Sequence, residues 1–190
     1  MAAVRFERLS LELSNRCSKA CWFCYSSSTP SGEGHWTVAD LGALLEDCAA
    51  HGTQAVSFGG GEPLEEPALL YPVLERLRGR LFRSFTTNGQ GLDRAWSDVV
   101  AAAPDKVHVS IHFPGSRAEV ARVVDQVGRL ARVGIRSGVN LLVMRGHLDD
   151  AASAVRVLHA SGIDNRRIVY LPMRGPNADT PSASELVRVA

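Results

Sequence analysis

Three cysteines lie close together near the start of the chain, in a Cys-x3-Cys-x2-Cys run made of Cys17, Cys21 and Cys24. Thiolates bind iron and zinc strongly, so three thiols on one loop indicate a metal centre. Three thiolates can hold three irons of a [4Fe–4S] cube, whereas a closed cluster takes four. The run therefore predicts a cluster with one iron left open, by analogy with the open coordination position of catalytic zinc sites.

A structural zinc site is the main alternative for this loop. It would need a fourth ligand, and His35 lies eleven positions beyond Cys24. Zinc ligands typically come as two close pairs, and the sequence has no second pair. The remaining cysteine, Cys48, falls on the apolar face of a predicted helix, so we expect it to be a small buried hydrophobe.

A second chemical signal is the run Gly59-Gly60-Gly61-Glu62-Pro63, which directly follows a short apolar stretch at 54–58. Glycines let a backbone approach a ligand closely, and a glutamate can pair with an ammonium group. The same run is also typical of a plain turn. Both this run and the cysteine loop follow predicted strands, and parallel α/β proteins bind ligands at the C-terminal ends of their strands.

Together the two motifs resemble the signature of the radical S-adenosylmethionine (SAM) superfamily, including the aromatic Phe23 just before the third cysteine. The resemblance implies a [4Fe–4S] cluster whose open iron binds the amino and carboxylate groups of SAM. It also implies that the Gly-Gly-Glu motif (residues 60–62) binds the methionyl amine. An external electron donor would reduce the cluster, and SAM would break to methionine and a 5′-deoxyadenosyl radical that abstracts hydrogen from a substrate. The protein need supply no catalytic side chain beyond these cofactors.

The resemblance and the strand-end positions give ten candidate SAM contacts. They are Phe23, Gly60, Gly61, Glu62, Asn88, Ser110, His112, Asn140, Leu171 and Met173. Several have a structural alternative: Asn88 can form an Asn-Gly turn, His112 can be a hydrogen-bonded core histidine, and Leu171 and Met173 can be core packing. Asn140 lies in an apolar strand, where a buried amide needs partners.

Strand and helix signals alternate along the whole chain. The predicted strands cover residues 9–13, 54–58, 81–86, 107–111, 138–143 and 167–171. Helical periodicity with glycine stops separates them, with Thr37 and Ser116 as expected N-caps. Strict alternation indicates a parallel sheet covered by helices. Because six units cannot close an eight-stranded barrel, we expect an α/β fold with an open (β/α)6 partial TIM barrel. We expect one domain over residues 1–190, with no auxiliary-cluster or leader-recognition domain.

Composition limits the partners. The formal net charge is +1 and 45% of the residues are hydrophobic, so no strong field favours nucleic acid or a membrane surface. No signal peptide and no apolar run of about 18 residues is present, so a cytoplasmic protein is expected. An arginine cluster at positions 76, 78, 80 and 83 either binds an acidic partner or complements a helix end.

The substrate is inferred from size. A compact chain with an open barrel side suits a large substrate, so we expect a peptide or protein, most simply the precursor of a ribosomally made and modified peptide. By layout the chain is similar to the spliceases, radical SAM proteins that work with a separate small partner protein on a precursor peptide. The alternatives are an activase of glycyl-radical enzymes, an enzyme for a small metabolite such as a deazapurine precursor, and a non-catalytic iron–sulfur subunit.

Overall fold

The protein is described by a computed structural model over residues 6–175 and 178–190. Its residues group into two compact units, Met1–Val107 and His108–Ala190, and each is described by itself below. The strand order in the sheet is β1-β2-β3-β4-β5-β6, and the pairs β1–β2, β2–β3 and β5–β6 are parallel. The predicted α/β class with an open (β/α)6 partial barrel is confirmed.

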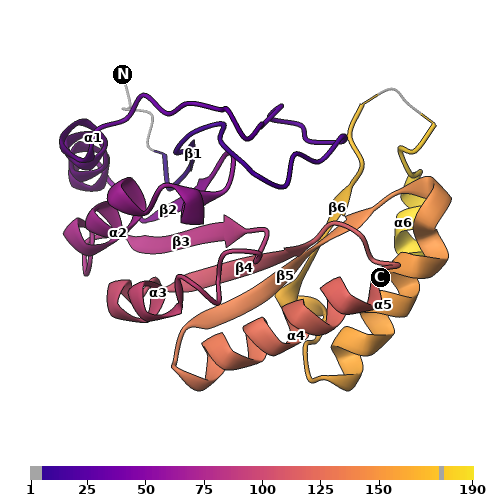
Figure 1. The fold of residues 1–190 in the computed structure, drawn as a ribbon. Coiled ribbons are helices and arrows are strands. Elements are labelled where there is room, and N and C mark those ends of the chain that lie inside the picture. Colours follow the sequence, from indigo (N-terminus) through magenta and orange to yellow (C-terminus); the bar gives the residue numbers. More distant parts are fainter. Residues whose placement is uncertain (1–5, 176–177) are drawn as a thin grey trace. The chain divides into compact units, whose positions relative to one another are not determined.

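The elements alternate as expected (Figure 1). The strands are β1 Arg8–Glu12, β2 Ala55–Gly59, β3 Phe82–Thr87, β4 Lys106–Ile111, β5 Arg136–Val143 and β6 Ile168–Pro172. The α-helices are α1 Val38–Ala50, α2 Pro67–Arg76, α3 Trp96–Ala102, α4 Arg117–Arg132, α5 Leu148–Ala160 and α6 Ala183–Val189. Three short 3-10 helices are η1 Pro63–Glu65, η2 Arg145–His147 and η3 Asn165–Arg167.

Side-chain caps begin three of the helices. The hydroxyl of Thr37 accepts the backbone N–H of Asp40 at the start of α1, and Ser116 does the same at α4. A reciprocal capping box between Ser182 and Glu185 begins α6. These caps satisfy backbone donors that a helix start leaves without intrahelical acceptors. The N-caps expected at Thr37 and Ser116 are therefore confirmed.

In the first unit, β2 and β3 alternate between half-buried and buried residues. Their buried face includes Val56, Phe58 and Phe85. Helices α1 and α2 pack together, as do α2 and α3 (Figure 1). The expectation that Cys48 is buried was wrong, because its side chain is only half-buried. Leu44, an apolar residue of the same helix, is 40% exposed. The contact face of α1 is narrower than its apolar stripe.

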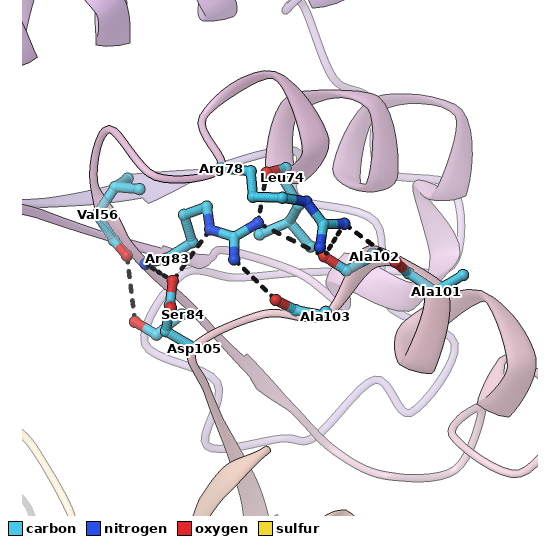
Figure 2. A network of polar contacts seen from close by, with 9 residues as sticks. All are labelled: Val56, Leu74, Arg78, Arg83, Ser84, Ala101, Ala102, Ala103 and Asp105. Atoms are coloured by element: carbon cyan, nitrogen blue, oxygen red, sulfur yellow. Dashed lines mark hydrogen bonds and ion pairs between the residues drawn. The ribbon is translucent and has the colours of Figure 1, made fainter. Parts of the chain in front are cut away.

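Two arginines of the cluster, Arg78 and Arg83, are hydrogen-bonded within this unit (Figure 2). The side chain of Arg83, 4% exposed, pairs with Asp105 at 3.0 Å and donates to the carbonyls of Leu74 and Ala103, each at 2.7 Å. Arg78 donates to the last carbonyls of α3. These bonds satisfy carbonyls at helix ends that have no intrahelical donor.

The other two arginines of the cluster share one acidic partner. Arg76 and Arg80 both pair with Glu46, at 2.7 and 2.8 Å, which links α2 and the residues after it to α1. All four guanidinium groups therefore have partners within the chain. The structural interpretation of the cluster explains them without an acidic partner protein.

In the second unit, β5 is buried from Ser137 onward. The inner face of α4 carries Val123, Val127 and Leu130, and that of α5 carries Leu158, all with no exposed area. Helices α5 and α6 pack together. Within the described ranges 6–175 and 178–190, none of the helices has both the length and the apolar character of a membrane span.

Candidate functional site

The cysteine loop and the Gly-Gly-Glu motif are bonded to each other through their backbones. The N–H of Gly61 donates to the carbonyl of Ser14, and the N–H of Glu62 donates to the carbonyl of Arg16, both at 2.7 Å. The parallel pairing of β1 with β2 is thus continued past the ends of both strands. Cys17 follows this junction immediately, so the first thiol is positioned by the motif after β2.

The glycines of the motif are required by this close backbone packing. Gly60 has a φ of +101°, and a Cβ there would lie 2.5 Å from the carbonyl oxygen of Ser14. A Cβ on Gly61 would lie 2.5 Å from the carbonyl carbon of Arg16. Side chains rarely adopt that φ, and neither position has room for one. The sequence analysis attributed the glycines to ligand approach, and the structure gives a second reason, the passage of the cysteine loop.

The loop is also closed at its far side. The N–H of Cys17 donates to the carbonyl of Thr29 at 2.9 Å, and the N–H of Thr29 donates to the carbonyl of Asn15 at 3.0 Å. Between these points the chain makes short turns, including Cys24 N–H to Cys21 carbonyl at 3.0 Å. All three cysteines are free thiols of intermediate exposure. The closed base fixes where the loop starts and ends, and the thiols stay accessible.

One thiol is already biased toward its metal-binding form. Burial by itself raises the pKa of Cys24, but hydrogen bonds from Ser26 and Ser28 outweigh it and hold the pKa below its ordinary value. The hydroxyl of Ser26 lies 3.4 Å from the sulfur. Because the thiolate is the metal ligand, these serines favour metal binding. Sequence analysis missed them, although the serine-rich stretch after Cys24 was visible.

The three thiols of the closed loop are the donor set that the sequence analysis assigned to a [4Fe–4S] cluster. In the part of the chain that the structure describes, no three His, Cys, Asp or Glu side chains gather where one metal ion could be held. Zinc needs its ligands to converge at about 2.0–2.3 Å from one point. A four-iron cluster does not, because each thiolate binds a different iron. Three thiols on one loop with a closed base match the ligand number of the predicted cluster.

The Glu62 carboxylate lies inside the unit, 3% exposed. It accepts the hydroxyl of Thr87 at 2.7 Å, the backbone N–H of Asn88 at 2.7 Å and that of Leu64 at 3.1 Å. Burial raises the pKa of Glu62, and these three hydrogen bonds oppose the rise. Binding of the SAM amine by the motif stays a prediction. Any contact through this side chain would compete with three internal donors.

Asn88 forms the Asn-Gly turn considered from the sequence, with its Oδ1 accepting the N–H of Gln90 at 2.8 Å. Its Nδ2 lies 3.7 Å from the sulfur of Cys17, a hydrogen-bond contact. A residue missed from sequence is Glu65, whose carboxylate oxygens accept the N–H of Ser18 at 2.9 and 3.2 Å. Both contacts attach the start of the cysteine loop to the chain that follows β2 and β3.

A cavity of about 500 Å³ opens beside this junction, and Ser18, Glu62, Tyr71 and Asn88 are among the residues that line it. The hydroxyl of Tyr71 is buried and has no hydrogen-bond partner among the described residues. Burial, with smaller effects of Asp98 and Glu62, raises the pKa of Tyr71 to about 12. The cavity thus offers a protonated phenol.

The remaining candidates of the first unit lie in the cysteine loop. Phe23 is half-buried, and its ring makes an edge contact with Trp22, with ring centroids 5.3 Å apart. The exposed Trp22 and Tyr25 were not singled out from the sequence. Contact of Phe23 with adenine stays a prediction.

Five candidates belong to the second unit and are described within it. Ser110 is buried, and Met173 is 7% exposed, whereas Leu171 is 36% exposed. The backbone N–H of His112 donates to Glu119 at 2.6 Å. Asn140 is buried, and its Oδ1 has no hydrogen-bond partner among the described residues. A buried acceptor of this kind is rare, which supports Asn140 as a ligand contact.

Comparison with known proteins decides the family. The model of the radical SAM superfamily matches residues 11–183. The chain belongs to the radical SAM superfamily. The [4Fe–4S] cluster and SAM expected from the cysteine run are the cofactors of that family, and the residues described above fit them.

The curated relatives of this radical SAM chain include enzymes of two kinds. A probable GTP 3′,8-cyclase of Methanopyrus kandleri is 34% identical over 108 residues, covering 57% of this chain and 34% of the relative. The mycofactocin maturase MftC of Mycobacterium ulcerans is 30% identical over 156 residues, covering 81% of this chain and 41% of the relative. The chain therefore matches less than half the length of each.

Among solved structures, SuiB of Streptococcus suis bound to S-adenosylmethionine is similar, with a TM-score of 0.77 at 17% identity. The match covers 97% of this chain and 46% of SuiB. SuiB bound to its precursor peptide SuiA gives a TM-score of 0.69 at 17% identity, over 84% of this chain and 38% of SuiB. At these identities the likeness establishes the fold.

Proposed function

We propose that this radical SAM chain acts on a peptide, the precursor of a ribosomally made and modified product. Cys17, Cys21 and Cys24 would hold the cluster, and the bound cluster and SAM, with an external electron donor, would supply the radical chemistry that removes hydrogen from the substrate. The chain's own contribution is to hold the cluster on residues 17–24 and to orient SAM at the strand ends. No side chain needs to act as nucleophile.

The observation that carries the proposal is the closed cysteine loop bonded to the Gly-Gly-Glu motif, which provides three thiols and no fourth. Support for a peptide substrate comes from the relative MftC, which is named a maturase, and from the structural neighbour SuiB, whose structure holds a precursor peptide. A splicease-like reaction and a separate partner protein for peptide recognition remain part of this proposal. A glycyl-radical activase is the alternative with a protein substrate.

A nucleotide substrate is the second candidate, because the first five curated relatives are GTP 3′,8-cyclases or probable ones. That match supports a small metabolite as the alternative to a peptide substrate. The two substrates differ in where the abstracted hydrogen originates. Isotope transfer therefore distinguishes them directly.

The test begins with anaerobic reconstitution of the full chain, followed by SAM and dithionite, and 5′-deoxyadenosine is then quantified. Cys17→Ala should lose the cluster absorbance and the deoxyadenosine. Cys48→Ala is the matched control and should keep the iron content of the unmodified chain, because Cys48 lies on α1 and not on the closed loop. Equal iron loss in the two variants would overturn the cluster assignment.

The substrate arm uses deuterium. Peptides encoded by short reading frames beside the gene are made with deuterated residues, and GTP deuterated on the ribose is tested in parallel. Deuterium from a peptide in the recovered 5′-deoxyadenosine supports the proposal. Deuterium from GTP alone would refute the peptide substrate and support the nucleotide alternative.

A further inference from the structure

The side-chain amide of Asn88 is aimed at a cluster ligand. Its Nδ2 is 3.7 Å from the sulfur of Cys17, although the two residues are separated by 71 positions in the chain. Asn88 is 6% exposed. The contact is partly buried, and an amide N–H that reaches a thiolate sulfur in such a place is an electrostatic contact of the kind that tunes iron–sulfur clusters.

The orientation of this amide is fixed by its neighbours. The backbone N–H of Gln90 points at Oδ1 from 2.8 Å, and only the oxygen of an amide can accept it. The nitrogen end must then face Cys17. The backbone N–H of Asn88 is in turn held by the buried Glu62 carboxylate at 2.7 Å. The donor is therefore preorganised and does not depend on a flexible rotamer.

We propose that Asn88 is a positioning residue for the cluster, one whose N–H donates to the Cys17 thiolate and makes the cluster easier to reduce. Reduction adds one electron, taken from an external reductant, and places more negative charge on the cluster and its sulfurs. A donor to sulfur stabilises that reduced form more than the oxidised one. The inference rests on the cluster of the proposed function and not on any substrate.

The key variant is Asn88→Ser in the full, reconstituted chain. A serine hydroxyl can still accept the N–H of Gln90 and keep the turn, but it is too short to reach the sulfur, and it adds no charge. Gln90→Ala is the matched control, because only the backbone of Gln90 takes part in the turn contact. Both variants are titrated potentiometrically with dithionite, and the reduced cluster is followed by electron paramagnetic resonance.

We expect Asn88→Ser to lower the equilibrium constant for reduction by roughly three- to tenfold, the effect of one modest hydrogen bond. A tenfold loss corresponds to a midpoint shift of about 59 mV to more negative potential in a one-electron couple. Gln90→Ala should titrate like the unmodified chain. An unchanged midpoint in Asn88→Ser would overturn the inference. A shift of equal size in Gln90→Ala would assign the effect to the turn, which also overturns it.

Partial cluster loading does not disturb this measurement, because a midpoint is read from the loaded fraction alone. A second readout needs no variant. The protein is produced in cells supplied with 15N-asparagine, and its cluster is then reduced. Electron–nuclear double resonance should show a hyperfine coupling between the reduced cluster and 15N, and absence of this coupling would refute the contact. If the unmodified chain assembles no cluster, the proposed function itself fails. A normal cluster that is insensitive to Asn88 refutes only this inference.

Discussion

Replacing Gly61 by alanine tests the central structural claim, that the Gly-Gly-Glu motif is shaped by the cysteine loop. A Cβ at this position would lie 2.5 Å from the carbonyl carbon and 2.8 Å from the amide nitrogen of Arg16. The carbonyl oxygen of Arg16 would be closer still, and ordinary contact begins at 3.4 Å, so the Arg16 backbone must move by more than the roughly 0.9 Å that the carbonyl carbon alone requires. The obstacle is backbone, which cannot rotate aside as a flexible side chain would.

That displacement has a calculable cost. Overpacking in a closely packed place costs about 1–3 kcal/mol. The moved carbonyl of Arg16 also loses the Glu62 N–H, now at 2.7 Å, which removes about 1 kcal/mol more. We therefore expect Gly61→Ala to lower the free energy of unfolding by about 2–4 kcal/mol. For a chain of this length the loss corresponds to a fall in Tm of roughly 4–16 °C.

The chain offers a control two residues away. Gly59 ends β2, and no described atom lies within 4 Å of an ideal Cβ there. Gly59→Ala should change Tm little, or raise it slightly by reducing the entropy of the unfolded chain. Both variants are compared as apo protein by thermal denaturation, and iron content is measured after reconstitution. Equal Tm values in the two variants would refute the packing argument.

Two further predictions concern elements outside the motif. Arg83→Met should destabilise the apo protein by about 3–5 kcal/mol, because it leaves the buried carbonyls of Leu74 and Ala103 without their donor. Arg80 is exposed, so Arg80→Met should have a much smaller effect on the free energy of unfolding measured by urea denaturation. Equal effects of the two variants would contradict the Arg83 network shown in Figure 2. Hydrogen bonds from the backbone and hydroxyl of Ser182, with Arg145, lower the pKa of Glu185 to about 2. A carboxyl group with a lowered pKa stabilises the fold at pH values above its unfolded pKa near 4.5, and this stabilisation is lost as the pH falls toward 2. Glu185→Gln should therefore reduce the dependence of the free energy of unfolding on pH between about 4.5 and 2. An unchanged dependence would contradict the capping box.

Much of the fold was accessible from sequence because it depends on local patterns. Apolar periodicity and caps such as Ser116 depend on neighbouring residues only, and the structure bears them out. Local patterns were insufficient where tertiary packing decides whether an apolar residue is buried and where a helix begins. Leu92 and Trp96 have the spacing of one helix face, but helix α3 begins only at Trp96. Leu92 is therefore buried from the turn before the helix, which periodicity alone does not reveal.

The site was harder to predict because its contacts are non-local. The cysteine run and the glycine run were visible as motifs, but nothing in their spacing indicates that Glu62 faces Thr87 and Asn88. Buried polar groups need partners, yet sequence does not say which of many distant donors will supply them. The same limit hid Glu65, whose partner Ser18 is 47 positions away.

This connectivity changes how loss of activity should be interpreted. The cysteine loop, the Gly-Gly-Glu motif and the Asn-Gly turn share hydrogen bonds, with Glu62 bonded to both of the other segments. A substitution at Glu62 therefore leaves buried donors unpaired, and each unpaired donor costs about 1–3 kcal/mol, before any contact with SAM is lost. Weaker SAM binding in Glu62→Ala would support a direct role only if cluster content and the cluster midpoint stayed at their original values. If both change together with SAM affinity, the motif acts on SAM through the loop that holds the cluster.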